Sequence, residues 1–294
     1  WLGVDLFFVL SGYLIFKHLI SISDTNQKIA FKQYALKRIL RTFPLFYTML
    51  LLLGLGLIPY YHPQAEWTDY LIHLAFLQDY FGNTILVPLW SLATEEKFYL
   101  SAPFLWLIFR NSSPKKFIAF ILVTVISITA IKSIYINNTV TTGNYTLFFS
   151  QFREPFHYAV VSILIGILVA QLCRFKQFRP HPIVAYIPIL LIVYAMLFNN
   201  LYNTSNWQRI NVLHLISTTS FGLLMWFAIT NSGKKYLKFL TGKSLRFFSI
   251  LSYALYLTHY AILPLTNKLQ RAYVYSEEAW IHASFFFGIY IMLS

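Results

Sequence analysis

The chain of 294 residues is 57% hydrophobic and only 11% charged. A soluble domain carries about 25% charged residues, so this chain cannot cover itself with a water-compatible surface. The composition excludes an ordinary soluble globular protein and indicates a polytopic membrane protein. The net charge of +13 could suggest a nucleic-acid-binding protein, but the basic residues cluster at the ends of apolar runs, where membrane proteins carry them.

The apolar runs predict an all-α fold, a polytopic transmembrane helical bundle with about nine spans in this chain. A spanning helix needs about 20 mostly apolar residues to cross a hydrocarbon core of roughly 30 Å. Runs of nearly this length lie at residues 2–20, 42–59, 86–109, 117–135, 156–173, 183–200, 210–230, 248–266 and 279–294.

The connecting segments alternate in charge, which predicts the orientation of the chain. Sixteen basic residues lie in four segments on one side of the predicted membrane: 21–41, 110–116, 174–182 and 231–247. The opposite segments contain five basic residues: Lys132, Arg153, Arg209, Lys268 and Arg271. Because basic loops stay in the cytoplasm, the pattern predicts a multi-pass protein of the cytoplasmic membrane, with the sixteen residues facing the cytoplasm.

The segment 60–85, on the predicted outer side, contains no Lys or Arg. Its apolar residues recur at helical spacing: Trp67, Tyr70, Leu71, Leu74 and Leu77. This spacing predicts a short amphipathic helix that lies in the outer interface of the membrane.

The third apolar run is interrupted near its middle by Glu95, Glu96 and Lys97. An ionisable side chain at the centre of a spanning helix costs about 2.5–3.5 kcal/mol, so it faces protein or water and usually has a function. Ser91, Glu95 and Tyr99 are four residues apart and share one helix face, which gives a polar line through an apolar helix. The alternative is a charge cluster that only lines a packed core between helices.

Arg38 and Arg41 lie three residues apart, hence on one helix face at the predicted cytoplasmic boundary. Guanidinium groups suit phosphate through paired hydrogen bonds, so the pair is a candidate anion clamp. The basic segment 234–246 lies on the same side and could extend such a site. The alternative is purely topological, because basic residues commonly end a span.

The first and eighth runs also carry polar residues. Asp5 lies near the outer end of the first run, where an interfacial acid could also be simply solvated, and Ser11-Gly12 form a small-residue notch for close helix packing. In the eighth run, Tyr256 and His259 share a face. A histidine near the middle of the membrane can shuttle a proton, although such a residue is often only a hydrogen-bonded part of the structure.

Two other histidines, His157 and His214, lie within apolar runs and are expected to be structural. The eight histidines show neither HxxxH nor HxxE spacing, so we expect no metal ligands. The single cysteine, Cys173, excludes an internal disulfide and a cysteine-rich metal centre.

Four stretches together resemble the acyltransferase-3 family of integral membrane O-acyltransferases: Gly3–Ile15, Arg38-x-x-Arg41, Trp90–Tyr99 and Ser252–His259. Their order and topology match the family over essentially the whole chain. The resemblance implies about ten or eleven spans in the full protein, cytoplasmic acyl-coenzyme A (acyl-CoA, commonly acetyl-CoA) as co-substrate, and no permanently bound cofactor. It also implies a carbohydrate or glycolipid acceptor that is modified as an O-ester, and a lipid bilayer as the environment.

The family's motifs transfer to this chain residue by residue. The resemblance implies that Arg38 and Arg41 bind the donor and that Glu95, Tyr256 and His259 are the candidate catalytic residues. Asp5, Ser11 and Gly12 match the family's first motif. The family has an earlier span with an Arg and, eleven residues on, a His thought to be catalytic. Residues 1–294 are expected to begin just after that span and so to lack this histidine. The expectation is therefore one acyltransferase domain over residues 1–294, truncated at both ends and inactive by itself.

The predicted function is transfer of an acetyl or similar short acyl group from cytoplasmic acyl-CoA to a hydroxyl of a cell-surface carbohydrate or glycolipid. The main alternative is a membrane carrier that moves acyl groups or lipid-linked sugars for a separate transferase, because buried acids also suit ion-coupled transport. A scaffold or sensor without chemistry is a third possibility, but it leaves the acids Glu95 and Glu96 unexplained.

Overall fold

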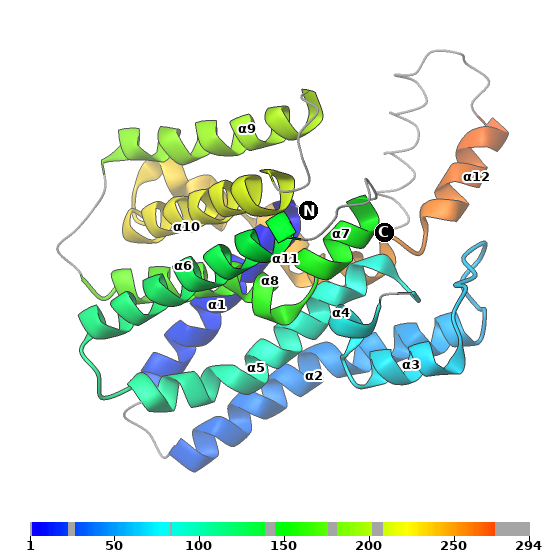
Figure 1. Ribbon diagram of the computed structural model, residues 1–294, viewed down its shortest axis with the longest axis horizontal. Coiled ribbons are helices and arrows are strands. Elements are labelled where there is room, and N and C mark those ends of the chain that lie inside the picture. Colours follow the sequence, from blue (N-terminus) through cyan, green and yellow to red (C-terminus); the bar gives the residue numbers. More distant parts are fainter. Residues whose placement is uncertain are drawn as a thin grey trace. The chain divides into compact units, whose positions relative to one another are not determined.

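The computed structural model describes residues 2–22, 27–82, 84–138, 145–175, 181–201 and 208–273 (Figure 1). Every regular element within these ranges is helical, which confirms the predicted all-α fold. The chain divides into two compact units. Unit 1 contains Trp1–Gln33 and Ala93–Phe239, and unit 2 contains Tyr34–Leu92 and Leu240–Ser294. The single-domain assignment stays a prediction.

Unit 1 is built around the helix pair α1 (Leu2–Ser21) and α8 (Phe156–Leu172), which pack along most of their length. Helix α10 (His214–Thr230) contacts both of them and also α9 (Tyr186–Leu201). The remaining elements of the unit are α6 (Pro114–Asn138), α7 (Tyr145–Phe152), the 3₁₀ turn η3 (Pro182–Ala185), the π-helical segment η4 (Gln208–Leu213) and most of α5 (Trp90–Phe109).

Glycines allow α1 and α8 to approach until their backbones touch. A Cβ on Gly12 would overlap the carbonyl oxygen of Ile163, and a Cβ on Gly166 would overlap the carbonyl oxygen of Val9. Small residues at such crossings are typical of helix pairs in membranes, where close van der Waals packing drives association. The predicted packing notch at Ser11-Gly12 is therefore confirmed.

Unit 2 contains most of α2 (Gln27–Gly54), α3 (Trp67–Leu74), α4 (Gln78–Phe81), the 3₁₀ turn η2 (Val87–Leu89), α11 (Lys243–Thr258) and α12 (Leu263–Tyr273). The 3₁₀ segment η5 (Lys235–Thr241) runs from unit 1 into unit 2. Helix α3 confirms the short helix predicted within residues 60–85. Phe76, just after α3, stacks on Phe46 of α2 with ring centroids 4.6 Å apart, which ties the two helices together.

The structure supports fewer spans than the sequence predicts. Within the residues that the structure describes, three helices are long and apolar enough to cross a membrane: Leu2–Ser21, Pro114–Ile136 and Ile210–Thr230. The number rises to five if each of two bent helix pairs is one span. Helix α5 does not qualify because it contains three charged residues near its middle. The count of nine therefore stays a prediction, and its last run, 279–294, lies outside the described residues.

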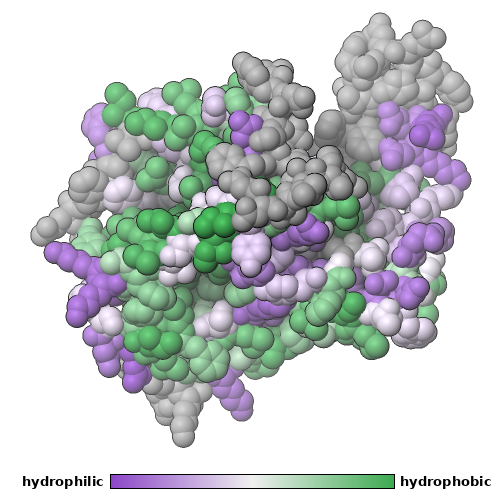
Figure 2. All heavy atoms as spheres, viewed as in Figure 1, coloured by the Kyte–Doolittle hydropathy of each residue, from purple (hydrophilic) through white to green (hydrophobic). Residues whose placement is uncertain are grey.

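Apolar side chains cover much of the visible surface, as expected of a chain that lies in lipid rather than water (Figure 2). On α1, Leu6, Leu10 and Leu14 are exposed at a spacing of four residues, and Leu190 is exposed on α9. Such continuous exposed apolar surface is uncommon in soluble monomers. It agrees with the membrane protein indicated by the composition.

Candidate functional site

Glu95 is held inside unit 1 by hydroxyl groups from two helices. Its carboxylate, only 3% exposed, accepts a hydrogen bond of 2.7 Å from the Ser11 hydroxyl of α1. The Tyr99 hydroxyl, one turn further along α5, donates to the same Oε1 atom. The polar line predicted along α5 thus has a structural basis between Glu95 and Tyr99. Two converging hydroxyl donors hold the carboxylate in one position, as a buried acid requires.

Glu96 and Lys97 do not lie on the face of α5 that Glu95 occupies, because neighbouring residues of a helix point about 100° apart. Glu96 is buried and Lys97 is half-buried. Thr94, on the other side of Glu95, is fully buried. The two adjacent acids therefore cannot share one partner face.

Asp5 is the centre of a second buried polar group in unit 1, the Asp5 cluster, which consists of Asp5, Arg153, Ser162, His214 and Thr218. Asp5 is 0% exposed and forms an ion pair with Arg153. Its Oδ1 atom also lies 3.2 Å from His214 Nε2 and accepts a 3.2 Å hydrogen bond from the Ser162 hydroxyl. The alternative of a simply solvated Asp5 is therefore wrong: α8 and α10 bury it completely.

The Ser, His and Asp side chains of this cluster do not form a nucleophilic triad. Ser162 Oγ lies 3.0 Å from His214 Nε2, and the same nitrogen faces Asp5. In a catalytic triad the acid binds the other ring nitrogen, which leaves the first nitrogen to take the serine proton. Ser162 Oγ also lies 3.1 Å from Thr218 Oγ1 and is wholly buried. The cluster is suited to fixing α1, α8 and α10 together.

Arg153 reaches the Asp5 cluster from the break between helices α7 and α8. Helices α7 and α8 meet at 65° across Arg153, Glu154 and Pro155. Pro155 has no amide hydrogen to donate and disfavours helical geometry in the residue before it, so the sequence favours a break here. The guanidinium of Arg153 turns inward from the corner, and only 2% of the residue is exposed.

Lys132 is also buried inside unit 1. It lies in α6, is 3% exposed, and its Nζ donates a 2.9 Å hydrogen bond to the carbonyl of Ile210 in the π-helical segment η4. The sequence pattern assigned both Lys132 and Arg153 to outer loops. Lys132 lies instead within α6, so its loop assignment is wrong, whereas Arg153 does lie in the turn between α7 and α8 but is buried there. Both are interior cations, because each finds a buried acceptor that only the folded chain provides.

In unit 2, Tyr256 and His259 come together at the end of α11. The Tyr256 hydroxyl donates to the carbonyl of Pro88 and also contacts the hydroxyl of Ser91. His259 Nδ1 lies 2.6 Å from the backbone carbonyl oxygen of Tyr256. The structure therefore brings these two predicted site residues together, beside the turn that starts α5. Glu95 belongs to the other unit.

Arg38 and Arg41 both lie on α2 in unit 2. The guanidinium of Arg38 is 6.0 Å from the ring centroid of Tyr34 and is half-buried, whereas Arg41 is exposed. Directly after Arg41, the carbonyl of Thr42 accepts a 2.9 Å hydrogen bond from the Tyr253 hydroxyl of α11. This contact connects the helix of the arginine pair to the helix that carries Tyr256.

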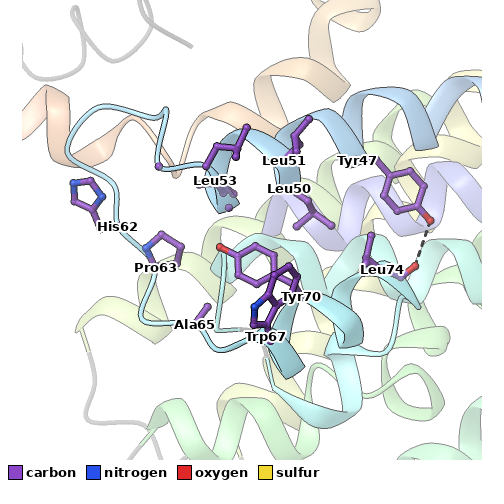
Figure 3. Close-up of a pocket in the computed structure, with 13 residues that line it drawn as sticks. Tyr47, Leu50, Leu51, Leu53, His62, Pro63, Ala65, Trp67, Tyr70 and Leu74 are labelled. Atoms are coloured by element: carbon purple, nitrogen blue, oxygen red, sulfur yellow. Dashed lines mark hydrogen bonds between the residues drawn. The ribbon is translucent and has the colours of Figure 1, made fainter.

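Unit 2 also contains a cavity of about 820 Å³ (Figure 3). Its walls come from the second half of α2 on one side, and from residues 62–65 and α3 on the other. Tyr47 closes one end by donating a 3.3 Å hydrogen bond to the carbonyl of Leu74. Leucine is the most frequent lining residue, and the polar or aromatic members are Tyr47, His62, Trp67 and Tyr70.

Within the described part of the chain, no group of three or more His, Cys, Asp or Glu residues is arranged to hold a metal ion. The sequence reasoning missed the Asp5 cluster as a unit. Two signals could have pointed to it: Arg153-Glu154-Pro155 is a charged helix break directly before an apolar run, and His214 is an ionisable residue inside another run.

Comparisons with known proteins agree with the resemblance seen in the motifs. A family model described as an acyltransferase domain, acyltransferase-3, matches residues 2–294. Peptidoglycan O-acetyltransferase OatA of Listeria monocytogenes is 26% identical over 299 residues, which cover 92% of this chain and 46% of that protein. O-acetyltransferase OatA of Staphylococcus aureus is 27% identical over 293 residues, which cover 91% of this chain and 47% of that protein.

The chain therefore spans about half the length of the curated relatives that it matches. No solved structure matches it significantly. Because the family model covers nearly the whole sequence, the predicted resemblance is confirmed, and the chain belongs to the acyltransferase-3 family.

Proposed function

We propose that this chain is the transfer domain of a membrane O-acyltransferase. It moves an acetyl or similar short acyl group from acyl-CoA on the cytoplasmic side to a hydroxyl of a cell-surface carbohydrate. The family match and the O-acetyltransferase relatives support the reaction class. Peptidoglycan, named for the Listeria relative, is the acceptor we would test first.

The observation that carries the proposal is the buried carboxylate of Glu95. Burying an acid costs free energy unless its oxygens accept hydrogen bonds, and here Ser11 and Tyr99 supply the donors. An acid that is kept inside an apolar unit at this cost is a functional-site candidate. We assign Glu95 to orienting the general base or to a proton relay, with Tyr256 and His259 as candidates for assistance.

The reaction needs a base and an oxyanion stabiliser. The acceptor hydroxyl oxygen forms a bond with the thioester carbonyl carbon, and its proton passes to the base. The carbon–sulfur bond then breaks, and coenzyme A leaves as a thiolate that takes up a proton. Proton transfer by a positioned side chain contributes about 10²–10⁴-fold, and hydrogen-bond donors aimed at the developing oxyanion contribute further.

The arginine pair is the proposed donor site. Arg38 and Arg41 are three residues apart on one helix, and a guanidinium binds phosphate oxygens through two parallel hydrogen bonds. Coenzyme A carries three phosphate groups, so a basic rim at the cytoplasmic boundary would capture it. Replacing both arginines with Ala should weaken acyl-CoA binding in an equilibrium assay. Unchanged affinity for acyl-CoA would show that Arg38 and Arg41 do not bind the donor.

The main experiment uses the full-length protein in inside-out membrane vesicles supplied with labelled acetyl-CoA. Base-labile label on carbohydrate is measured for the wild type and for Glu95→Gln. We expect Glu95→Gln to lower the rate by about a hundredfold or more. Glu96→Gln is the matched control, since it makes the same change one residue away on another face of α5 and should keep most of the activity.

The possible results separate the proposals. Equal loss in both variants would mean that α5 tolerates no amide here and would overturn a specific role for Glu95. Donor binding without ester on any carbohydrate would favour the carrier function instead. Ser11→Ala and Tyr99→Phe each remove one donor to Glu95, so each should reduce the rate less than Glu95→Gln does.

A further inference from the structure

The large cavity of unit 2 has a composition that suits a lipid rather than a polar substrate (Figure 3). We propose that it holds a hydrocarbon tail of a membrane lipid whose headgroup carries an amine and has no net negative charge. The chemistry of phosphatidylethanolamine fits this description. The lining residues all belong to unit 2.

The cavity has the size of a true ligand site. Its volume of about 820 Å³ falls within the range of roughly 300–1,000 Å³ that small-molecule pockets occupy. Gly54 contributes to its width, because a Cβ at this position would lie 3.3 Å from the ring of Tyr70. The next glycine, Gly56, has φ +65°, a left-handed conformation that turns the chain away from the end of α2.

The cavity is continuous with the apolar surface of the unit. Leu51 lines the cavity and is 61% exposed, and Leu55 lines it and is similarly exposed. Leu57, just beyond them, is exposed as well. In a membrane protein such leucines meet lipid, so a tail can enter from the surrounding bilayer without crossing water. Water in an apolar cavity would gain few hydrogen bonds, whereas hydrocarbon fills it favourably.

One rim of the cavity has the residues typical of the membrane interface. Trp67 is 82% exposed at the start of α3, Tyr70 follows one turn later, and His62 lies on the preceding loop. Trp and Tyr are enriched at the level of the lipid headgroups, where one end of the ring is apolar and the other is polar. A lipid with its tail in the cavity would place its headgroup at this rim.

The charge at the rim selects the headgroup. Residues 55–82 contain no Lys or Arg, but they contain the acids Glu66 and Asp69 beside the aromatic residues. Asp69 accepts a 2.8 Å hydrogen bond from the backbone amide of Glu66, whereas the Glu66 side chain is exposed. Lys268 of α12 lies over the ring of Tyr60 and, like Glu66 and Asp69, does not itself line the cavity. The two acids, however, directly precede the lining residues Trp67 and Tyr70. An ammonium group complements this acidic rim, and an anionic headgroup is repelled by it.

The test uses the full-length protein in vesicles of phosphatidylcholine that contain a trace of phosphatidylethanolamine with a photoactivatable acyl chain. After illumination, mass spectrometry locates the attached lipid. We expect labelling within residues 47–74. Leu51→Trp should reduce this labelling about tenfold, because the indole displaces roughly two methylene groups of the tail. Leu190→Trp, an equally exposed change on α9, is the matched control and should leave it unchanged.

A second comparison tests the headgroup. The same probe built on phosphatidylglycerol should label residues 47–74 less than the phosphatidylethanolamine probe does. Glu66→Gln should narrow that difference without abolishing labelling, which also shows that the variant is folded. Equal labelling by both probes in the wild type would overturn the headgroup assignment. Labelling that is insensitive to Leu51→Trp, or that spreads evenly over the exposed helices, would overturn the site.

Discussion

Each unit contains a sharply bent helix pair, and the side chains at the two bends make different kinds of contact. In unit 1, α7 and α8 meet at 65° around Arg153, Glu154 and Pro155, and Arg153 forms an ion pair with the buried Asp5. In unit 2, α11 and α12 meet at 82°, and the residue that follows α11 is His259. There the contacts are between hydroxyl, imidazole and carbonyl groups.

The difference shows where the chain can tolerate change. A buried ion pair leaves an uncompensated charge when one partner is lost, whereas a neutral hydrogen bond leaves only an unsatisfied dipole. Removing either partner of the ion pair at the bend of unit 1 should therefore strongly destabilise the packing of α1, α8 and α10. The bend of unit 2 should tolerate substitution better, because its contacts are between neutral groups.

The largest effect should come from breaking the ion pair. Arg153→Met leaves Asp5 charged and buried, so we expect a loss of about 3–5 kcal/mol in the free energy of unfolding. Thermal unfolding of the full-length protein in lipid nanodiscs measures this. The double variant Asp5→Leu, Arg153→Met should recover most of the loss, since it leaves no buried charge from the pair. A double variant as unstable as the single one would show that the lost stability does not come from an unpaired buried charge.

The close crossing of α1 and α8 should be nearly as sensitive. Gly12→Ala places a methyl group against the backbone of Ile163, so overpacking should cost about 1–3 kcal/mol. Gly3→Ala is the control on the same helix, because a Cβ on Gly3 meets nothing within 4 Å. The same unfolding assay compares them. If both variants had wild-type stability, the two helices would be further apart than the structure places them.

A smaller effect is expected in the bend of unit 2. Tyr256→Phe removes the hydroxyl that binds the Pro88 carbonyl, which should lower the free energy of unfolding by about 0.5–1.5 kcal/mol. Tyr194→Phe, at an exposed tyrosine of α9, is the control. If acyl transfer by Tyr256→Phe falls far more than its stability does, Tyr256 acts in the reaction. A parallel fall would make it structural.

The smallest effect should be visible only at high pH. Burial, followed by the neighbouring Tyr260, raises the pKa of Tyr61 from 10.0 to about 12. The folded state therefore holds this proton more tightly than the unfolded state does. The resulting stability is fully present below pH 10 and is lost as the pH rises through about 12.

The difference in phenolate absorbance between the wild type and Tyr61→Phe measures this titration directly. Tyr61 also donates a 2.8 Å hydrogen bond to the carbonyl of Ile85, which favours its neutral form. A difference spectrum that titrates at the ordinary value of 10.0 would show that the loop before α3 is more open than in the structure.

Local sequence was sufficient for the helical class, for α3 and for the packing notch at Gly12, because these depend on composition, periodicity and residue size. It also identified Glu95 as an acid within an apolar run and placed Tyr256 and His259 one turn apart. It could not supply the partners of these residues. Ser11 lies 84 positions before Glu95, and no periodicity connects two helices so far apart in the chain.

Sequence alone determined that this is an all-α membrane protein of the acyltransferase-3 family, since hydrophobic content and short motifs can be recognised without knowing which residues are in contact. Only the tertiary structure decided which charges are interior. Asp5, Lys132 and Arg153 have the sequence context of boundary residues, yet all three are buried. Whether a charge at the end of an apolar run faces water or protein depends on the helices packed beside it, and that packing exists only in the folded chain.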